Sequence, residues 1–239
     1  MISDEEAITL FSFATDGAPG MGRLSDRATD HLRMLIVSLQ LEPGAVLDDS
    51  ALVTRLSCGS TPLREAIQRL SGEHLIRILP RRAIAVAPIT VTDLQQIYEV
   101  RLATESMAAR LAASRTDTAQ VAALEEHVTA LLDDSVRTNS LTVVRHDFLF
   151  HYQLARMASN SYLCDSIQRI LGPAMRLTYF AYKHGEPSTE ARLEHAAILQ
   201  ALLAHDASAA EHEMRRHLTV AKERTLRQIL SWRAEEVSS

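Results

Sequence analysis

The chain has 239 residues, enough for one large domain or two modest ones, and 46% of them are hydrophobic, as in soluble proteins that bury a core. Its net charge of −5 argues, by itself, against a nucleic-acid partner. No apolar run approaches the roughly 20 residues that span a bilayer, and the N-terminus lacks the pattern of a secretory signal. The two cysteines, Cys58 and Cys164, lie far apart in the sequence, and we expect both to be reduced thiols. We therefore expect a cytoplasmic protein without a membrane partner.

Residues 1–20 include TDGAPGMG and have no periodicity, so we predict a flexible N-terminal segment. An amphipathic helix over 26–40 follows and ends at Leu-Glu-Pro-Gly. A short helix over 49–56 has Asp48 or Asp49 as its N-cap, and Ser-Cys-Gly-Ser forms a tight turn. The next helix, over 62–72, has Pro62 at its first position and Thr61 as its cap.

Two helices joined by a short turn that contains glycine form a helix-turn-helix arrangement. The stretches LIRILP and AIAVAPI after them predict a β-hairpin, or wing, with Arg81 and Arg82 at its tip. We therefore predict a winged helix-turn-helix domain over 21–89. Between residues 55 and 82, six arginines stand against two acids, an excess of four positive charges. Such a patch is typical of a DNA contact, although a solvated mixed surface would look the same.

From Thr90 onward the pattern is helical. We predict helices near 91–114, 117–136, 140–158, 160–183, 188–205 and 207–233, with a break in the fourth at Gly172-Pro173. The chain is thus mainly α, with an antiparallel all-α bundle over 90–235 after the winged domain.

A possible metal site follows from spacing within the bundle. Asp147 and His151 are four residues apart and share a helix face. If the chain reverses near Asp206, His195 and His217 each lie eleven residues from the turn and come out level, about 16 Å from it. Three imidazoles and one carboxylate could then bind zinc, nickel or manganese. A simple Asp–His hydrogen bond is the alternative. We expect four other histidines, His127, His146, His205 and His212, at the surface.

By its motifs the sequence resembles the GntR family of bacterial transcription regulators. The family's hallmark opens the recognition helix as Thr-Pro-apolar-Arg-Glu-Ala, here residues 61–66. YEVRLATESMAARLAA and HDFLFHYQLARMASN resemble the helical FCD domain of the FadR subfamily. Three residues depart from the pattern. Gly59-Ser60 replaces a Ser-Arg pair whose arginine normally touches DNA in the family, and His74 and Ala83 replace glycines near the end of the helix and in the wing.

This resemblance implies which residues contact DNA. Arg64 would project from the end of the recognition helix that enters the major groove, where its planar fork matches the acceptors of guanine. The alternative is a surface ion pair with Glu65 or Glu73. Thr61 and Ser60 could bind a phosphate at the helix N-terminus. The remaining candidates for backbone or minor-groove contacts are Arg55, Arg81 and Arg82.

The FCD resemblance also implies a ligand site. Asp147, His151, His195 and His217 match the usual metal set of that domain, with zinc as the first choice. Arg101 looks like the family arginine that faces the pocket and could hold a carboxylate, or else it pairs with Glu105. Asn160 is a weaker effector-binding candidate and could instead be the N-cap of the next helix.

These residues indicate a homodimeric regulator that binds a double-stranded DNA operator and responds to a small carboxylate metabolite. Dimers of helix-turn-helix domains read two half-sites. One alternative is a metal-dependent, hydrolase-like enzyme. The sequence spacing places no general base beside the metal ligands, which argues against this alternative. Another is a regulator that senses the metal itself.

Overall fold

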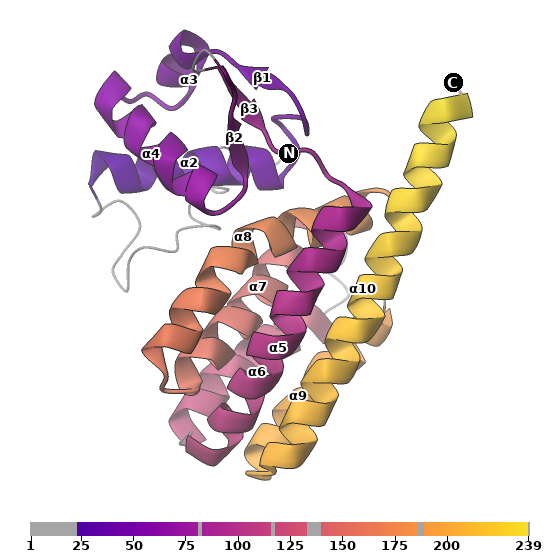
Figure 1. The fold of residues 1–239 in the computed structure, drawn as a ribbon. Helices are drawn as coiled ribbons and strands as arrows, with labels where there is room; N and C mark the ends of the chain where they lie inside the picture. The colour runs from indigo at the N-terminus through magenta and orange to yellow at the C-terminus, as the bar shows by residue number, and fades with distance from the viewer. Residues whose placement is uncertain (1–22, 81–82, 116–117, 133–139, 186–188, 239) are drawn as a thin grey trace. The chain divides into compact units, whose positions relative to one another are not determined.

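The computed structural model describes residues 23–80, 83–115, 118–132, 140–185 and 189–238. The predicted flexible segment over 1–20 lies outside these ranges. The chain divides into two compact units, one ending at Ile89 and one beginning at Thr90 (Figure 1). No helix in the described ranges is long and apolar enough to cross a membrane.

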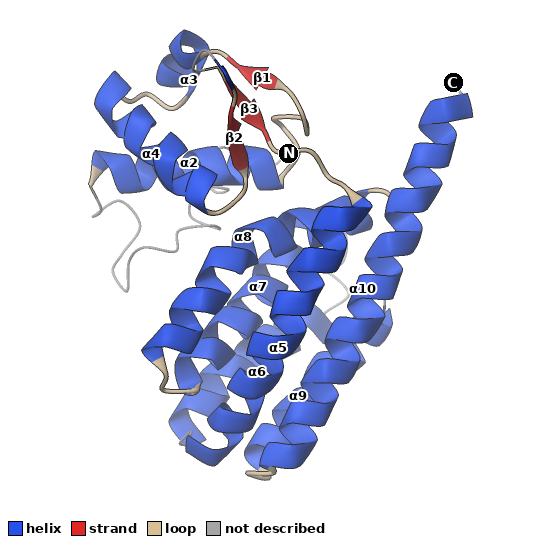
Figure 2. Ribbon diagram, viewed as in Figure 1, coloured by secondary structure: helices blue, strands red, loops and turns tan. Residues whose placement is uncertain are grey.

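The first unit combines helices with a small sheet, coloured by type in Figure 2. Its elements are α2 (Leu24–Val37), β1 (Val46–Leu47), α3 (Asp49–Arg55), α4 (Ser60–Gly72), β2 (Ile76–Ile78) and β3 (Ile84–Val86). The strands are antiparallel, in the order β1-β3-β2. The predicted winged helix-turn-helix is therefore confirmed. Strand β1 was not predicted, because two residues carry no alternation of their own.

The N-termini of α3 and α4 differ in how they are capped. The side chain of Asp48 accepts a hydrogen bond from the Ala51 amide at 2.7 Å, so one of the two predicted caps of α3 is present. Helix α4 begins at Ser60, and Gly59 occupies its N-cap without a side-chain hydrogen bond. The predicted cap by Thr61 is wrong. Pro62 is accepted inside this first turn because the amides there have no intrahelical partner in any case.

A buried ion pair joins α2 to the end of α4. The Arg33 guanidinium donates to both carboxylate oxygens of Glu73, at 2.7 and 3.0 Å, and to Asp30 at 2.6 Å. Burial opposes its charge, but the two carboxylates raise the pKa of Arg33 overall. Apolar side chains that are at most 1% exposed, Leu32, Leu35, Leu63 and Leu70, fill the adjacent core. Helix α4 is thus held by its inner face and presents its outer face to solvent.

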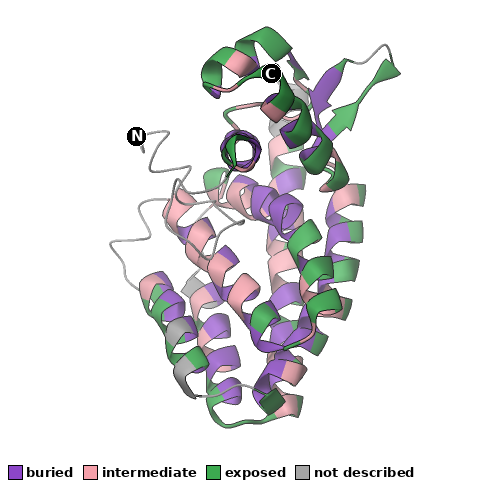
Figure 3. Ribbon diagram, turned by 90° about the vertical axis from the view of Figure 1, so that its left-hand side faces the viewer, coloured by how far each residue is buried: buried purple, intermediate pink, exposed green. Residues whose placement is uncertain are grey.

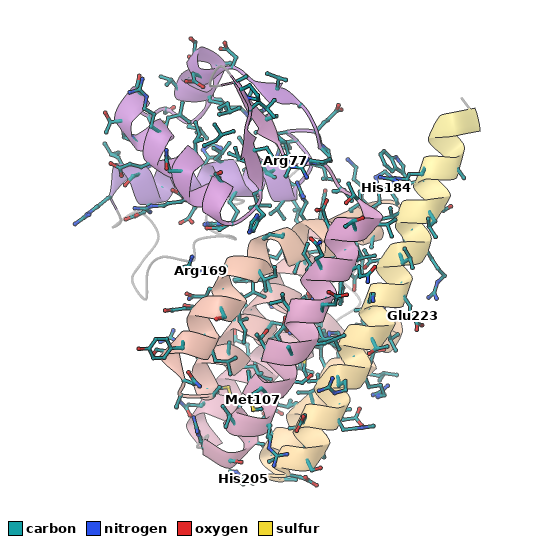
Figure 4. All side chains as sticks on the ribbon, viewed as in Figure 1. Arg77, Met107, Arg169, His184, His205 and Glu223 are labelled. Carbon is teal, nitrogen blue, oxygen red and sulfur yellow. The ribbon has the colours of Figure 1, made fainter. Side chains whose placement is uncertain are left out.

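The second unit is a helical bundle, as predicted. Its helices are α5 (Val91–Arg115), α6 (Thr118–Leu132), α7 (Ser140–Met157), α8 (Ser161–Lys183), α9 (Thr189–Leu203) and α10 (Ala207–Ser238). Buried residues line their inward faces (Figure 3), whereas charged side chains such as Arg169 and Glu223 project outward (Figure 4).

Two features of the bundle differ from expectation. Helix α8 runs through Gly172-Pro173 without a break, and both residues are buried. Its neighbours Leu171 and Leu177 are also buried, so packing on both sides of the proline offsets the lost backbone hydrogen bond. Helix α10 extends to Ser238, five residues past the predicted end at 233.

The turn after α4 explains why the family has glycine where this chain has His74. The backbone of His74 is left-handed, with φ of +59°. Its amide donates to Ser71 O at 3.1 Å, and the Leu75 amide donates to Leu70 O at 2.9 Å. A Cβ atom is disfavoured in this conformation, and glycine adopts it freely.

We predict that His74→Gly stabilises the DNA-reading unit by about 0.5–1 kcal/mol, since removal of the left-handed strain exceeds the added entropy of the unfolded chain. Hydrogen exchange of the α4 amides, measured in the full chain, should slow by about two- to fivefold. His74→Ala keeps the Cβ atom and should give no such slowing. Equal exchange rates in the glycine and alanine variants would contradict this explanation.

Candidate metal centre and DNA-binding surface

Asp147, His151, His195 and His217 converge from three helices of the bundle. One possible ligand atom from each lies within 4.8 Å of those from the other three. The histidine side chains are at most 3% exposed and that of Asp147 is 17% exposed. The predicted metal set therefore forms one buried cluster of three nitrogen donors and one oxygen donor.

The reversal between α9 and α10 brings two of these histidines level. His205 has a φ of +53°, and the side chain of Asp206 accepts hydrogen bonds from the amides of Ser208 and Ala209. The ring centroids of His195 and His217 are 4.4 Å apart. Equal rise per residue along both helices is enough to produce this match.

Two pairs of ligand atoms within the cluster are 3.3 Å apart. Nε2 of His151 lies at this distance from Nε2 of His217, and Nε2 of His195 lies at this distance from Oδ1 of Asp147. Two ligands that are each about 2.1 Å from one ion at a tetrahedral angle are about 3.4 Å apart. The spacing therefore fits a common first-row metal ion.

Two buried glutamates lie behind this cluster. Oε2 of Glu105 is 2.6 Å from Nδ1 of His151, and Oε2 of Glu194 is 2.8 Å from Nδ1 of His217. Sequence reasoning considered Glu105 only as a partner of Arg101 and missed Glu194. Its position next to His195 gave no signal, because adjacent residues on a helix point in different directions.

These glutamates decide which ring nitrogens carry hydrogen. A neutral imidazole has one N–H, and an ionised carboxylate can only accept a hydrogen bond. The Glu194 contact therefore favours a proton on Nδ1 of His217, and the close Glu105 carboxylate favours the same tautomer of His151. The two Nε2 atoms are 3.3 Å apart, and in these tautomers a bound cation would replace a repulsion between lone pairs by two favourable contacts. The donor set thus fits a divalent metal.

Burial favours the neutral form of two of the imidazoles, those of His195 and His217. Burial lowers the pKa of His217 to about 3 and also lowers the pKa of His195. Burial alone would raise the pKa of Glu105, but the Arg101 charge and the contact with His151 together outweigh it and lower the pKa to about 2. Neutral imidazoles beside ionised carboxylates are the states in which these residues bind metals.

Arg101 is buried behind the cluster and pairs with Glu105, the alternative considered from sequence. Its Nε and Nη2 atoms lie 2.6 and 3.3 Å from the carboxylate oxygens, and its side chain is 3% exposed. Its guanidinium lies 5.1 Å from the ring centroid of Tyr98. Within the described ranges, Nη1 makes no hydrogen bond and is left for another acceptor.

Two further expectations about the bundle can be compared with the structure. Asn160 is the N-cap of α8, and its side chain accepts a hydrogen bond from the Leu163 amide at 3.1 Å. This capping role was its alternative interpretation. The expected surface positions of His127 and His146 are wrong: His127 is buried, His146 is half-buried, and their Nδ1 atoms are 3.3 Å apart.

The predicted DNA-reading residues lie at the start of α4. Ser60, Thr61 and Arg64 are exposed. Glu73, one of the two acids considered as a partner for Arg64, is bound by Arg33. Arg64 has no ion pair or hydrogen bond to any residue that the structure describes.

The other arginines of the patch differ in their surroundings. Arg55 is exposed and donates to Gln40 at 2.6 Å. Arg69 pairs with Asp26 on α2. Arg81 and Arg82 lie outside the described residues.

Both units match known protein families. Residues 24–86 match the bacterial regulatory proteins of the gntR family, and residues 96–220 match the FCD domain. The chain belongs to the GntR family. It is therefore a transcription regulator with a DNA-binding helix-turn-helix and an FCD domain.

This GntR regulator has relatives that are regulators as well, and not enzymes. It is 29% identical to the HTH-type transcriptional repressor RspR of Escherichia coli over 86% of this chain and 91% of that protein. It is 31% identical to an uncharacterized HTH-type regulator of Agrobacterium vitis over 60% and 80% of the two chains. The solved structure of McbR from Escherichia coli has a TM-score of 0.77 at 22% identity, over 87% of this chain and all of that one.

We predict that the wild-type regulator retains one divalent metal ion per chain through purification and that His195→Ala with His217→Ala abolishes this. The double variant removes two of four donors, and partial sites bind weakly. Elemental analysis after dialysis provides the measurement. His212→Ala, an exposed histidine on the same helix as His217, is the matched control and should keep the metal. Equal metal content in the double variant and wild type would contradict the site.

Proposed function

We propose that this regulator binds its DNA operator as a homodimer of the FadR subfamily and that a small carboxylate, held at a divalent metal, controls this binding. The observation that carries the proposal is the convergence of Asp147, His151, His195 and His217, with the Nε2 atoms of His151 and His217 3.3 Å apart. Zinc is the first choice, with nickel or manganese as alternatives for the same donors. Since its target is DNA, we propose that the protein acts in the cytoplasm.

The charges around the cluster support an anionic effector. Asp147, Glu105 and Glu194 supply three negative charges, and Arg101 and Arg224 supply two positive ones. With neutral histidines the five groups carry one excess negative charge. A divalent ion reverses this to one excess positive charge, which a single carboxylate neutralises.

Arg101 supports the same class of ligand. Its Nε and Nη2 atoms are committed to Glu105, and Nη1 can donate to a carboxylate oxygen. Glu105 in turn contacts the ligand His151. One guanidinium therefore lies next to both the proposed metal shell and the proposed effector.

Helix α5 offers a route from this site to DNA. It carries Arg101 and Glu105, and it begins at Val91, two residues after the DNA-reading unit ends at Ile89. An effector that binds better to one arrangement of α5 would shift the population of that arrangement. In a dimer, such a shift changes the spacing of two DNA-reading heads and hence operator affinity.

A regulator that senses only the metal is the second candidate. Four protein donors are enough to complete a tetrahedral zinc shell without a metabolite. A panel of small carboxylates, such as acetate, pyruvate and citrate, tested for DNA release from zinc-loaded protein separates the two. The effector proposal expects release by at least one acid, and only with metal bound. Release by zinc alone, unaffected by every acid, would favour the metal sensor.

We predict that Arg64→Ala lowers the preference for operator over scrambled DNA by about 1–3 kcal/mol, roughly five- to 150-fold, because it removes a bidentate base contact. Sequences selected from a random library by the wild type supply the operator, and fluorescence anisotropy at fixed salt gives both affinities. Arg69→Ala is the matched control, since Arg69 lies on the same helix but pairs with Asp26. An unchanged preference in the Arg64 variant would exclude it as a base reader.

We predict that Arg101→Lys weakens the response to the active carboxylate by about tenfold or more and leaves metal content unchanged. Lysine keeps the charge beside Glu105 but cannot donate to two carboxylates through a rigid fork. The concentration of acid that releases half of the DNA provides the measurement. Arg110→Lys, on an exposed face of the same helix, is the control. A normal response in Arg101→Lys would remove the arginine from the effector site.

A further inference from the structure

We propose that Glu105 and Glu194 are positioning residues, each of which fixes the tautomer and orientation of one histidine so that its Nε2 faces the metal. This inference rests on the metal centre proposed above. It assigns a task to two buried carboxylates that are not in the donor set, and it separates the three histidines into two that are fixed and one that is not.

Glu194 shows the arrangement most clearly. Glu194 lies on α9 and is 3% exposed. Its Oε2 atom accepts a hydrogen bond from Nδ1 of His217 on α10 at 2.8 Å. The Arg224 guanidinium contacts both of its carboxylate oxygens, at 3.3 Å each. Arg224 is 19% exposed at its side chain, so this chain of three groups leads from the surface to the proposed ligand.

Glu105 repeats the same order on different helices. Arg101 binds it from one side, and Nδ1 of His151 lies 2.6 Å from its Oε2 atom on the other. Both glutamates thus pair with a guanidinium, which favours the ionised form, and an ionised carboxylate can accept a hydrogen bond but cannot donate one. The hydrogen bond from His217 to Glu194 therefore needs a proton on Nδ1 of His217 and leaves its Nε2 free to bind a metal. Nδ1 of His151 lies close to Glu105 without a hydrogen bond, and there the negative charge alone favours the same tautomer.

His195 provides the contrast. Within the described residues no carboxylate is paired with its Nδ1 atom, whereas Glu105 lies 2.6 Å from Nδ1 of His151, and the Nε2 atom of His195 faces Asp147, itself a proposed ligand. Nothing in its surroundings favours the Nδ1–H form. It serves as an internal reference whose tautomer should not depend on Glu105 or Glu194.

Loss of such a carboxylate has a specific consequence. If the proton of His217 moves to Nε2, that nitrogen has no lone pair for a metal until the tautomer changes back. Outer-shell partners of histidine ligands typically contribute 10- to 100-fold to metal affinity. An ion pair that only stabilises the fold would have no such effect on tautomer.

The test compares Glu194→Gln with Arg224→Gln in the full-length protein. Zinc affinity is measured by competition with a chromophoric chelator. We expect Glu194→Gln to bind zinc about tenfold or more weakly, and Arg224→Gln to stay within about threefold of wild type, because the carboxylate remains. Glu213→Gln, which removes an exposed charge paired with Arg216, controls for net charge. Glu194 is preferred over Glu105 because a Glu105 variant leaves the Arg101 charge buried and unpaired.

Nitrogen-15 NMR of the imidazoles in metal-free protein reads the tautomers directly. We expect His151 and His217 as Nδ1–H in wild type, and a gain of Nε2–H at His217 alone in Glu194→Gln. If Glu194→Gln binds zinc with the wild-type affinity and keeps the wild-type tautomer of His217, the positioning role is overturned. Equal losses in Glu194→Gln and Arg224→Gln would overturn it in favour of an ion pair that stabilises the fold. Absence of zinc binding by wild type would instead overturn the metal centre itself.

Discussion

The proposed metal centre depends on one contact in the bundle core, in which Nε2 atoms of two imidazoles lie 3.3 Å apart. In the proposed tautomers this contact is unfavourable unless a cation shares both lone pairs. It persists because each ring is bound from behind by a buried glutamate, on His151 by Glu105 and on His217 by Glu194. The protein thus stabilises a geometry that is suited to a metal ion better than to the isolated side chains.

Burial of so many charges in one bundle requires compensation, and the structure provides it in chains rather than in isolated pairs. Arg101 and Arg224 offset the two glutamates, and Asp147 is left with the histidines and the proposed ion. In the DNA-reading unit, Arg33 and Glu73 form a similar ion pair, and there it holds α2 against the end of α4. The difference is that the bundle's chains end on the proposed metal ligands, so their charges would also act on a bound ion.

Much of the fold could be predicted because it depends on local signals. Helical periodicity gave the bundle, and the turn at Asp206 brought His195 and His217 level since both helices rise equally per residue. Local signals also misled. The predicted Thr61 cap is replaced by Gly59, and the predicted break at Pro173 is absent because its neighbours are buried on both sides.

The outer part of the site could not be predicted in the same way. Glu194 precedes His195 in sequence, yet it serves His217 on the neighbouring helix. Glu105 lies four residues after Arg101, which indicates a surface ion pair as readily as a buried chain. Both roles depend on the rotation of packed helices about their axes, which neither spacing nor composition determines.

A crystal structure of the zinc-loaded protein, with anomalous scattering data on both sides of the zinc edge, would locate the ion directly. We expect one anomalous peak per chain, within about 2.1 Å of Nε2 of both His151 and His217. Protein with stoichiometric zinc by elemental analysis but no peak between these two nitrogens would contradict the proposed metal centre.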